Sequence, residues 1–176
     1  QDLVSWQIMV ADGKSLPLKQ DQIPMQGWSI ECRIYAEDPD RKFIPSPGKI
    51  TYMSTPSGPY VRNDCGVYEG SEVSSYYDPM ISKLSVWGPD RITAIGRMKS
   101  ALCEYQIGGN RTNLQFHRTV MDNEDFKNGL FNTSFLDKPF WITTSFPSEI
   151  IPFAIATALL DEIKSTSTPI IIGAET

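Results

Sequence analysis

Arg33 is the residue of this sequence whose type and setting best fit a chemical role. It lies in the middle of a run, residues 28–36, in which apolar and polar residues alternate. The alternation predicts a strand that carries Arg33 on its polar face, between Glu31 and Tyr35. A guanidinium fixed on a strand offers planar donors to a carboxylate, a phosphate or a developing oxyanion. The alternative is a solvated sheet face on which Arg33 forms only a cross-strand ion pair.

Acidic residues beside turns and a second arginine are weaker candidates. Glu37 and Asp38 have metal-binding side chains, but carboxylates next to a proline turn usually cap the turn. Magnesium would also require substrate phosphates or further carboxylates nearby. Asp78 precedes a proline and fits a turn in the same way. Arg62 follows a tight turn, where it is either a surface charge or a partner in an interface ion pair.

Composition and missing motifs exclude several classes of protein. The net charge of −5 and the pI near 4.9 argue against a surface for nucleic acid. No apolar run reaches the roughly 20 residues that cross a bilayer, so we expect neither a nucleic-acid nor a membrane partner. The sequence contains no GxxxxGK(S/T), GxGxxG or GxSxG motif.

The cysteines and the single histidine do not predict a metal site. The three cysteines, Cys32, Cys65 and Cys103, are odd in number and far apart, which favours free thiols over disulfides or zinc ligation. His117 has no Cys or His neighbour at ligand spacing. We therefore expect it to have an ordinary structural or surface role.

The elements that must position Arg33 begin with a helix predicted over residues 2–13, which Asp2 can cap and Gly13 can end. Further extended runs follow the strand of Arg33 and are separated by Gly- and Pro-containing turns. They cover residues 49–55, 60–65 and 80–87. Several short strands joined in this way predict an antiparallel sheet.

The apolar period changes from strand to helix after residue 90. Residues 91–106 carry one apolar stripe at spacings of three and four, formed by Ile95, Met98, Leu102 and Tyr105. A second helix is predicted over 112–123, so the order of sheet and then helices indicates an α+β fold, an antiparallel sheet with packed helices. Residues 140–147 have the composition of a linker, and 151–164 that of a short apolar helix.

Five collinear segments resemble a known family, the biotin carboxylases. They are WSIECRIYAEDP, FIPSPGKI, VRNDCGVYEG, YYDPMISKL and RMKSALCEYQIGGNRTN. The order and spacing match over roughly residues 1–138. The resemblance implies the C-terminal portion of an ATP-grasp biotin carboxylase, present here as a partial C-terminal domain over 1–138. Residues 139–176 are then a linker and short helix leading towards a downstream region.

The resemblance also implies a reaction and a role for Arg33. In this family, ATP and bicarbonate form carboxyphosphate, and the carboxyl group moves to N1 of biotin. The arginine of the matching ECRI run contacts the ureido oxygen of biotin, so Arg33 inherits that role. A fixed guanidinium would stabilise the charge that reaches this oxygen when the ureido nitrogen is deprotonated.

Four further residues receive weaker roles from the resemblance. Arg62 and Asp78 match segments near the dimer interface of the family, which implies a homodimer. Thr133 and Ser134 lie in a segment that approaches the adenine in relatives, and no metal ligand is implied within this chain.

The family's nucleotide-binding lysines, metal-binding glutamates and general base precede the segment that this chain matches. We therefore expect the ATP-grasp lobe to be missing and the isolated chain to be inactive, with ATP, Mg²⁺ and bicarbonate bound only in the full enzyme. The implied partners are that lobe, a separate biotin carboxyl carrier domain and a carboxyltransferase of an acyl-CoA or pyruvate carboxylase. A cytoplasmic or mitochondrial-matrix location is implied, with a role such as fatty acid metabolism. The alternative is a noncatalytic structural or dimerisation module.

Overall fold

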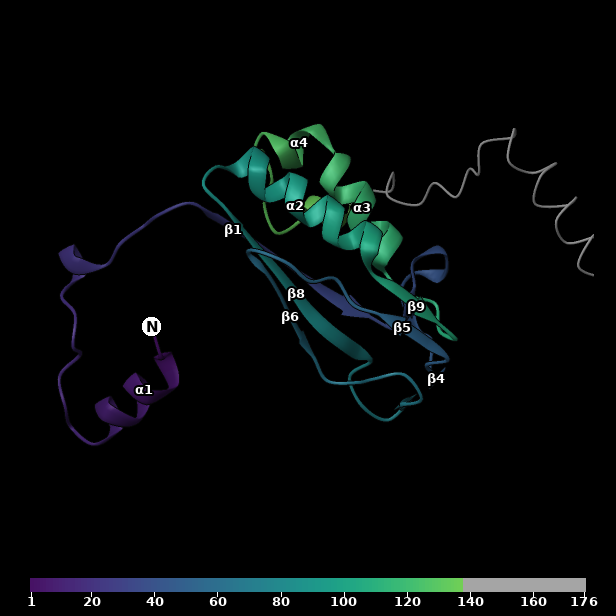
Figure 1. Ribbon diagram of the computed structural model, residues 1–176, viewed down its shortest axis with the longest axis horizontal. Coiled ribbons are helices and arrows are strands. Elements are labelled where there is room, and N and C mark those ends of the chain that lie inside the picture. The colour runs from purple at the N-terminus through teal and green to yellow at the C-terminus, as the bar shows by residue number, and fades with distance from the viewer. Residues whose placement is uncertain (138–176) are drawn as a thin grey trace, which may run out of the picture. The chain divides into compact units, whose positions relative to one another are not determined.

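The main sheet contains the strand of Arg33. A computed structural model of the chain describes residues 1–137. In it, strands β1 (Trp28–Tyr35), β8 (Met80–Gly88) and β6 (Val61–Cys65) form an antiparallel sheet in the order β1-β8-β6 (Figure 1). The three strands correspond to three of the runs that the sequence predicted, so the antiparallel sheet is confirmed.

One face of this sheet is built from apolar side chains. Along β1, Ile30, Cys32 and Ile34 are buried. Leu84 of β8 lies opposite Cys32 and is fully buried. The predicted alternation fails only at its first position, because Trp28 is 50% exposed.

Helix α2 (Arg91–Glu104) packs against β8 and β1 on the apolar face. The side chain of Asp90 caps it by accepting a hydrogen bond of 2.8 Å from the backbone N–H of Thr93. This bond is the first cause of the lowered pKa of Asp90. The predicted apolar stripe is buried, as expected for the inner side of an amphipathic helix; its members are Ile95, Met98, Leu102 and Tyr105.

Two more helices complete the helical layer. They are α3 (Leu114–Asp122), predicted from the sequence, and the short α4 (Glu124–Lys127), which was not predicted. Both contact neighbouring helices, and Figure 1 shows α2, α3 and α4 together on one side of the sheet. The prediction of an α+β fold is confirmed.

The strand predicted over residues 49–55 is wrong in one respect, because it is two strands. β4 (Gly48–Lys49) pairs with β7 (Glu72–Val73), whereas β5 (Tyr52–Ser54) pairs with β9 (Gln106–Gly108). The partner changes at the residues between them. The N–H of Ile50 donates to Ser71 at 2.9 Å, and that of Thr51 donates to Gly108 at 2.9 Å.

The remaining described elements are short or lie near the N-terminus. Helix α1 (Leu3–Ala11) is capped as predicted, since Asp2 accepts a 2.9 Å hydrogen bond from the N–H of Ser5. The others are η1 (Gln20–Gln22), β2 (Glu37–Asp38), η2 (Pro39–Arg41), β3 (Ile44–Pro45) and η3 (Phe135–Asp137). The predicted linker and helix beyond residue 138 lie outside the described residues. No helix within residues 1–137 is long and apolar enough to span a bilayer.

Candidate functional site

The second face of the β1-β8-β6 sheet carries polar and charged side chains in two rows. Residues paired across antiparallel strands point to the same face, and the register therefore defines each row. From β1 through β8 to β6, the rows are Glu31, Ser85, Arg62 and Arg33, Lys83, Asp64. We call this surface the open face, because α2 packs on the other side of the sheet. Arg33 and Arg62 both lie on the open face. For Arg33 this agrees with the polar face of β1 that the alternation predicted.

Arg33 is accessible and loosely paired. Its Nε lies 3.4 Å from Oε1 of Glu31, and the two side chains are 57% and 46% exposed. The pKa of Arg33 is raised, first by a hydrogen bond with the side chain of Tyr35 and next by the one with Glu31. The guanidinium therefore stays charged, and its two neighbours Glu31 and Tyr35 occupy only part of its five N–H donors, which leaves others to meet an anionic oxygen.

A second cation lies directly across the sheet from Arg33. The carbonyl oxygen of Arg33 points away from β8, which makes Arg33 and Lys83 a non-hydrogen-bonded pair with closely spaced side chains. Asp64 lies on the other side of Lys83, but its carboxylate accepts from Nε of Arg62 at 3.0 and 2.9 Å. The row therefore places two like charges side by side, an arrangement that favours an anion.

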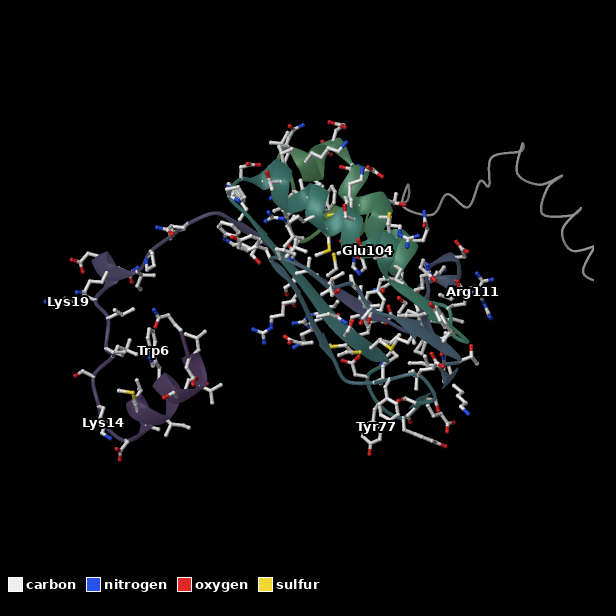
Figure 2. All side chains as sticks on the ribbon, in the orientation of Figure 1. Trp6, Lys14, Lys19, Tyr77, Glu104 and Arg111 are labelled. Atoms are coloured by element: carbon white, nitrogen blue, oxygen red, sulfur yellow. The ribbon has the colours of Figure 1, made fainter. Side chains whose placement is uncertain are left out.

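Arg62 and Asp78 do not share a common site within the chain. Arg62 forms its ion pair with Asp64 along its own strand. Asp78 lies in the turn before β8, where its Oδ1 accepts a 3.1 Å hydrogen bond from the N–H of Met80. Burial first, and the charge of Asp78 second, raise the pKa of the nearby Glu37. The neighbouring Tyr77 projects into solvent and is 82% exposed (Figure 2).

Thr133 and Ser134 belong to the helical side of the sheet. The N–H and hydroxyl of Ser134 donate to Oδ1 of Asn132 at 3.0 and 2.7 Å. The next residue, Phe135, is buried near the ring of Phe126 in α4. The structure does not bring Thr133 or Ser134 to the open face that carries Arg33.

Two residues near Arg33 were missed as parts of the site. Nδ2 of Asn113 and Nε2 of His117 each lie 3.0 Å from the carbonyl oxygen of Arg33. The sequence signal for Asn113 is its residue type in the first turn of the helix predicted over 112–123, since asparagine is typical of a capping residue. His117 was expected to have only a structural or surface role. Burial lowers its pKa, so the ring is neutral near pH 7.

The described residues suit the binding of an anion better than that of a metal. Within residues 1–137, no three His, Cys, Asp or Glu side chains gather as a metal site would require. Cys32 is buried, and burial raises the pKa of its thiol to about 12. That thiol is therefore not a nucleophile at neutral pH. The chemistry that the open face offers is hydrogen-bond donation from a fixed guanidinium.

Comparison with known proteins identifies first a class, the biotin-dependent carboxylases. A biotin carboxylase from Nostoc is 50% identical over 137 residues, covering 78% of this chain and 31% of that protein. A pyruvate carboxylase subunit from Methanothermobacter thermautotrophicus is 51% identical over 137 residues, covering 78% of this chain and 28% of that protein. The chain thus spans under a third of the length of these relatives.

The family then follows from a domain match and a solved structure. The sequence-family model of the biotin carboxylase C-terminal domain matches residues 31–138 of this chain. The biotin carboxylase domain dimer of Hydrogenobacter thermophilus 2-oxoglutarate carboxylase, solved with MgADP, ADP and bicarbonate, has a TM-score of 0.73 at 42% identity. The match covers 78% of this chain and 30% of that chain. The chain belongs to the biotin carboxylase C-terminal domain family, which confirms the predicted resemblance.

Proposed function

We propose that this chain forms the C-terminal domain of a biotin carboxylase and that Arg33 binds the ureido oxygen of biotin during ATP- and bicarbonate-dependent carboxylation. The observation that carries the proposal is the exposed Arg33 guanidinium on a rigid strand of the open face. Membership of the family supplies the reaction class. The residues present fit an anionic oxygen, because the guanidinium has planar donors that Glu31 only partly occupies.

The role proposed for Arg33 is electrostatic. Biotin, when bound, would present a ureido oxygen that takes up negative charge as a general base outside this chain removes the N1 proton. Two N–H donors of one guanidinium can meet that oxygen and stabilise the charged form more than the neutral one. The adjacent Lys83 raises the local positive potential and favours the same charge state. Arg33 would hold the ureido oxygen in place while the carboxyl group passes from carboxyphosphate to N1 and phosphate leaves.

We infer that nucleotide and magnesium are bound by another part of the enzyme. The acidic side chains of residues 1–137 do not gather as magnesium ligands, and the chain spans only 31% of its Nostoc relative. The ATP-grasp lobe, a carrier domain that brings biotin and a carboxyltransferase complete the proposed enzyme. Arg62 and Asp78 are the proposed interface residues of a homodimer, and Thr133 and Ser134 are the residues of this chain proposed to lie near the nucleotide.

The test is Arg33→Ala in the complete enzyme, assayed with free biotin. Loss of one donor to a developing oxyanion typically lowers kcat about 10²- to 10³-fold, and we expect a loss of that order with the KM for ATP unchanged. Arg41→Ala is the matched control, because Arg41 is an exposed arginine of η2 away from the open face rows. Wild-type carboxylation by the Arg33 variant would refute the role of Arg33.

A second experiment addresses the isolated chain. We expect purified residues 1–176 to cleave no ATP in the presence of biotin and bicarbonate, because the proposed nucleotide site lies elsewhere. Biotin-dependent release of phosphate by this chain alone would contradict the assignment of ATP binding to another part of the enzyme.

A further inference from the structure

The backbone of β1 at Arg33 is held by α3 rather than by a neighbouring strand. Within residues 1–137, β1 lies at the edge of the sheet and pairs with β8 alone. At Arg33 and Tyr35 the backbone groups on the outer side meet Asn113 and His117. The amide of Asn113 donates from Nδ2 to the carbonyl oxygen of Arg33 at 3.0 Å and accepts at Oδ1 from the N–H of Tyr35 at 3.0 Å.

The contacts of Asn113 reproduce those of a missing strand. One amide side chain donates to residue 33 and accepts from residue 35, as a neighbouring peptide would in a β-ladder. Its own backbone N–H adds a bond of 3.3 Å to the carbonyl of Tyr35. Nε2 of His117, one turn further along α3, adds a second contact of 3.0 Å to the carbonyl of Arg33. Together these hydrogen bonds fix the peptide units of β1 on both sides of Ile34.

Asn113 gives up the usual role of its position in order to make these bonds. It is the N-cap residue of α3, where an asparagine side chain normally accepts a bond from the first turn. Here the side chain makes no capping bond and is directed to β1, and the residue is only 5% exposed. The cost of burying an amide is offset because both its donor and its acceptor side find partners.

The pairing of β1 with β8 is irregular at the same point of the strand. The register between β1 and β8 shifts between Ile34 and Tyr35. Such an irregularity bends a strand and changes the direction of its side chains. Asn113 binds the backbone at Arg33 and at Tyr35, on either side of Ile34, and His117 adds a bond at Arg33, so these contacts lie at the irregularity.

We infer that Asn113 and His117 are positioning residues that fix the guanidinium of Arg33 by fixing its backbone. This inference rests on the proposed function of Arg33. A side chain that must meet a developing charge within a fraction of an ångström depends on the peptide that carries it, because small displacements lower the rate steeply. Neither Asn113 nor His117 touches the substrate in this proposal.

The test uses Asn113→Ala in the complete enzyme, alone and combined with Arg33→Ala. We expect the single variant to lose about 10- to 100-fold in kcat/KM for free biotin, with the KM for ATP unchanged. The double variant should be no slower than Arg33→Ala alone, because Asn113 acts through Arg33. A purely structural role would instead lower the activity in both backgrounds by the same factor.

Two further variants keep the test decisive. Asn123→Ala is the matched control, because Asn123 is also an asparagine N-cap, of α4, but its Oδ1 makes the ordinary capping bond to Phe126. It should change thermal stability without changing kcat/KM for biotin. His117→Phe keeps an aromatic ring and loses the bond to Arg33, and it should show a smaller loss of the same kind even if Asn113→Ala does not fold.

The outcomes separate this inference from the proposed function. If Arg33→Ala retains full carboxylation, the proposed function fails and the inference fails with it. If Arg33→Ala is impaired while Asn113→Ala and His117→Phe match the wild type, only the positioning role is refuted. Multiplicative losses in the double variant, or a raised KM for ATP, would also overturn it.

Discussion

The two faces of the β1-β8-β6 sheet are built from neighbouring residues of the same strands but serve different purposes. On the covered face, Leu84 is fully buried against α2 and lies opposite Cys32. On the open face, the adjacent Lys83 is exposed and lies opposite Arg33. Stability therefore depends on one face, while the other is free to place charges that a solvated or substrate-bound surface can use.

Arg33 is both rigid and available because the two faces of its strand have different roles. Its strand is anchored by apolar residues that point the other way, such as Cys32 and Ile34. The guanidinium itself needs no burial, because the strand beneath it supplies the order. A side chain on a flexible loop would lose conformational entropy when it binds substrate, and this loss would weaken binding.

The largest expected difference in stability between variants of the two faces is at Leu84. Leu84→Ala leaves a cavity under α2 and should lower the free energy of unfolding by about 2–5 kcal/mol. Lys83→Ala, the next residue on the same strand, should change it by no more than about 0.5 kcal/mol. Urea unfolding of both variants measures the difference. Equal effects would show that the two faces are not distinct in the way that the burial pattern indicates.

A pair of arginines gives the next largest contrast. Arg91 on the helical side lies over the rings of Trp28, Phe126 and Phe131, with centroid distances of 5.6, 4.9 and 5.4 Å. Its guanidinium also donates to the carbonyl of Lys127 at 3.1 Å and to that of Phe126. Arg91→Met should therefore cost about 1–3 kcal/mol of stability.

Arg62→Met is the counterpart of that variant on the open face. Arg62 pairs with Asp64 in solvent, where ion pairs contribute little. We expect no resolvable change in the urea midpoint for Arg62→Met under conditions in which Arg91→Met shifts it clearly. A larger loss for Arg62→Met would mean that the open face contributes to folding of the chain itself.

Much of the fold could be predicted from the sequence because the periods are regular. The alternation around Arg33 predicted both the strand and its polar face, and the stripe ending at Tyr105 predicted α2. In both cases the spacing of apolar residues follows from the burial of one face of a single strand or helix. The residues of that element are therefore sufficient to predict it. The open face could be anticipated in the same way for Arg33.

The parts that could not be predicted depend on partners distant in sequence. The split of the predicted strand at Ile50 depends on two pairing segments, near residues 72 and 107. Trp28 is half exposed, and the cation that lies over its ring, Arg91, is far along the chain. Asparagine is a residue type typical of an N-cap, but at Asn113 the amide binds the backbone of β1, which is distant in sequence.

The smallest expected effect is a change in the pH dependence of stability. It concerns His117, which contacts the carbonyl of Arg33 at the edge of the sheet. Burial lowers the pKa of His117 in the folded state below its unfolded value of about 6.5. The unfolded chain therefore binds more protons in this range, and stability falls as the pH drops from about 7.5 to about 5.5. His117→Phe removes this contribution, so its thermal midpoint should fall less than that of the wild type over the same interval. Glu37, whose pKa is raised, contributes with the opposite sign but is present in both proteins and cancels. Identical pH slopes for the two proteins would show that the ring of His117 is solvated when folded, and the edge of the sheet would then not be closed as the hydrogen bond implies.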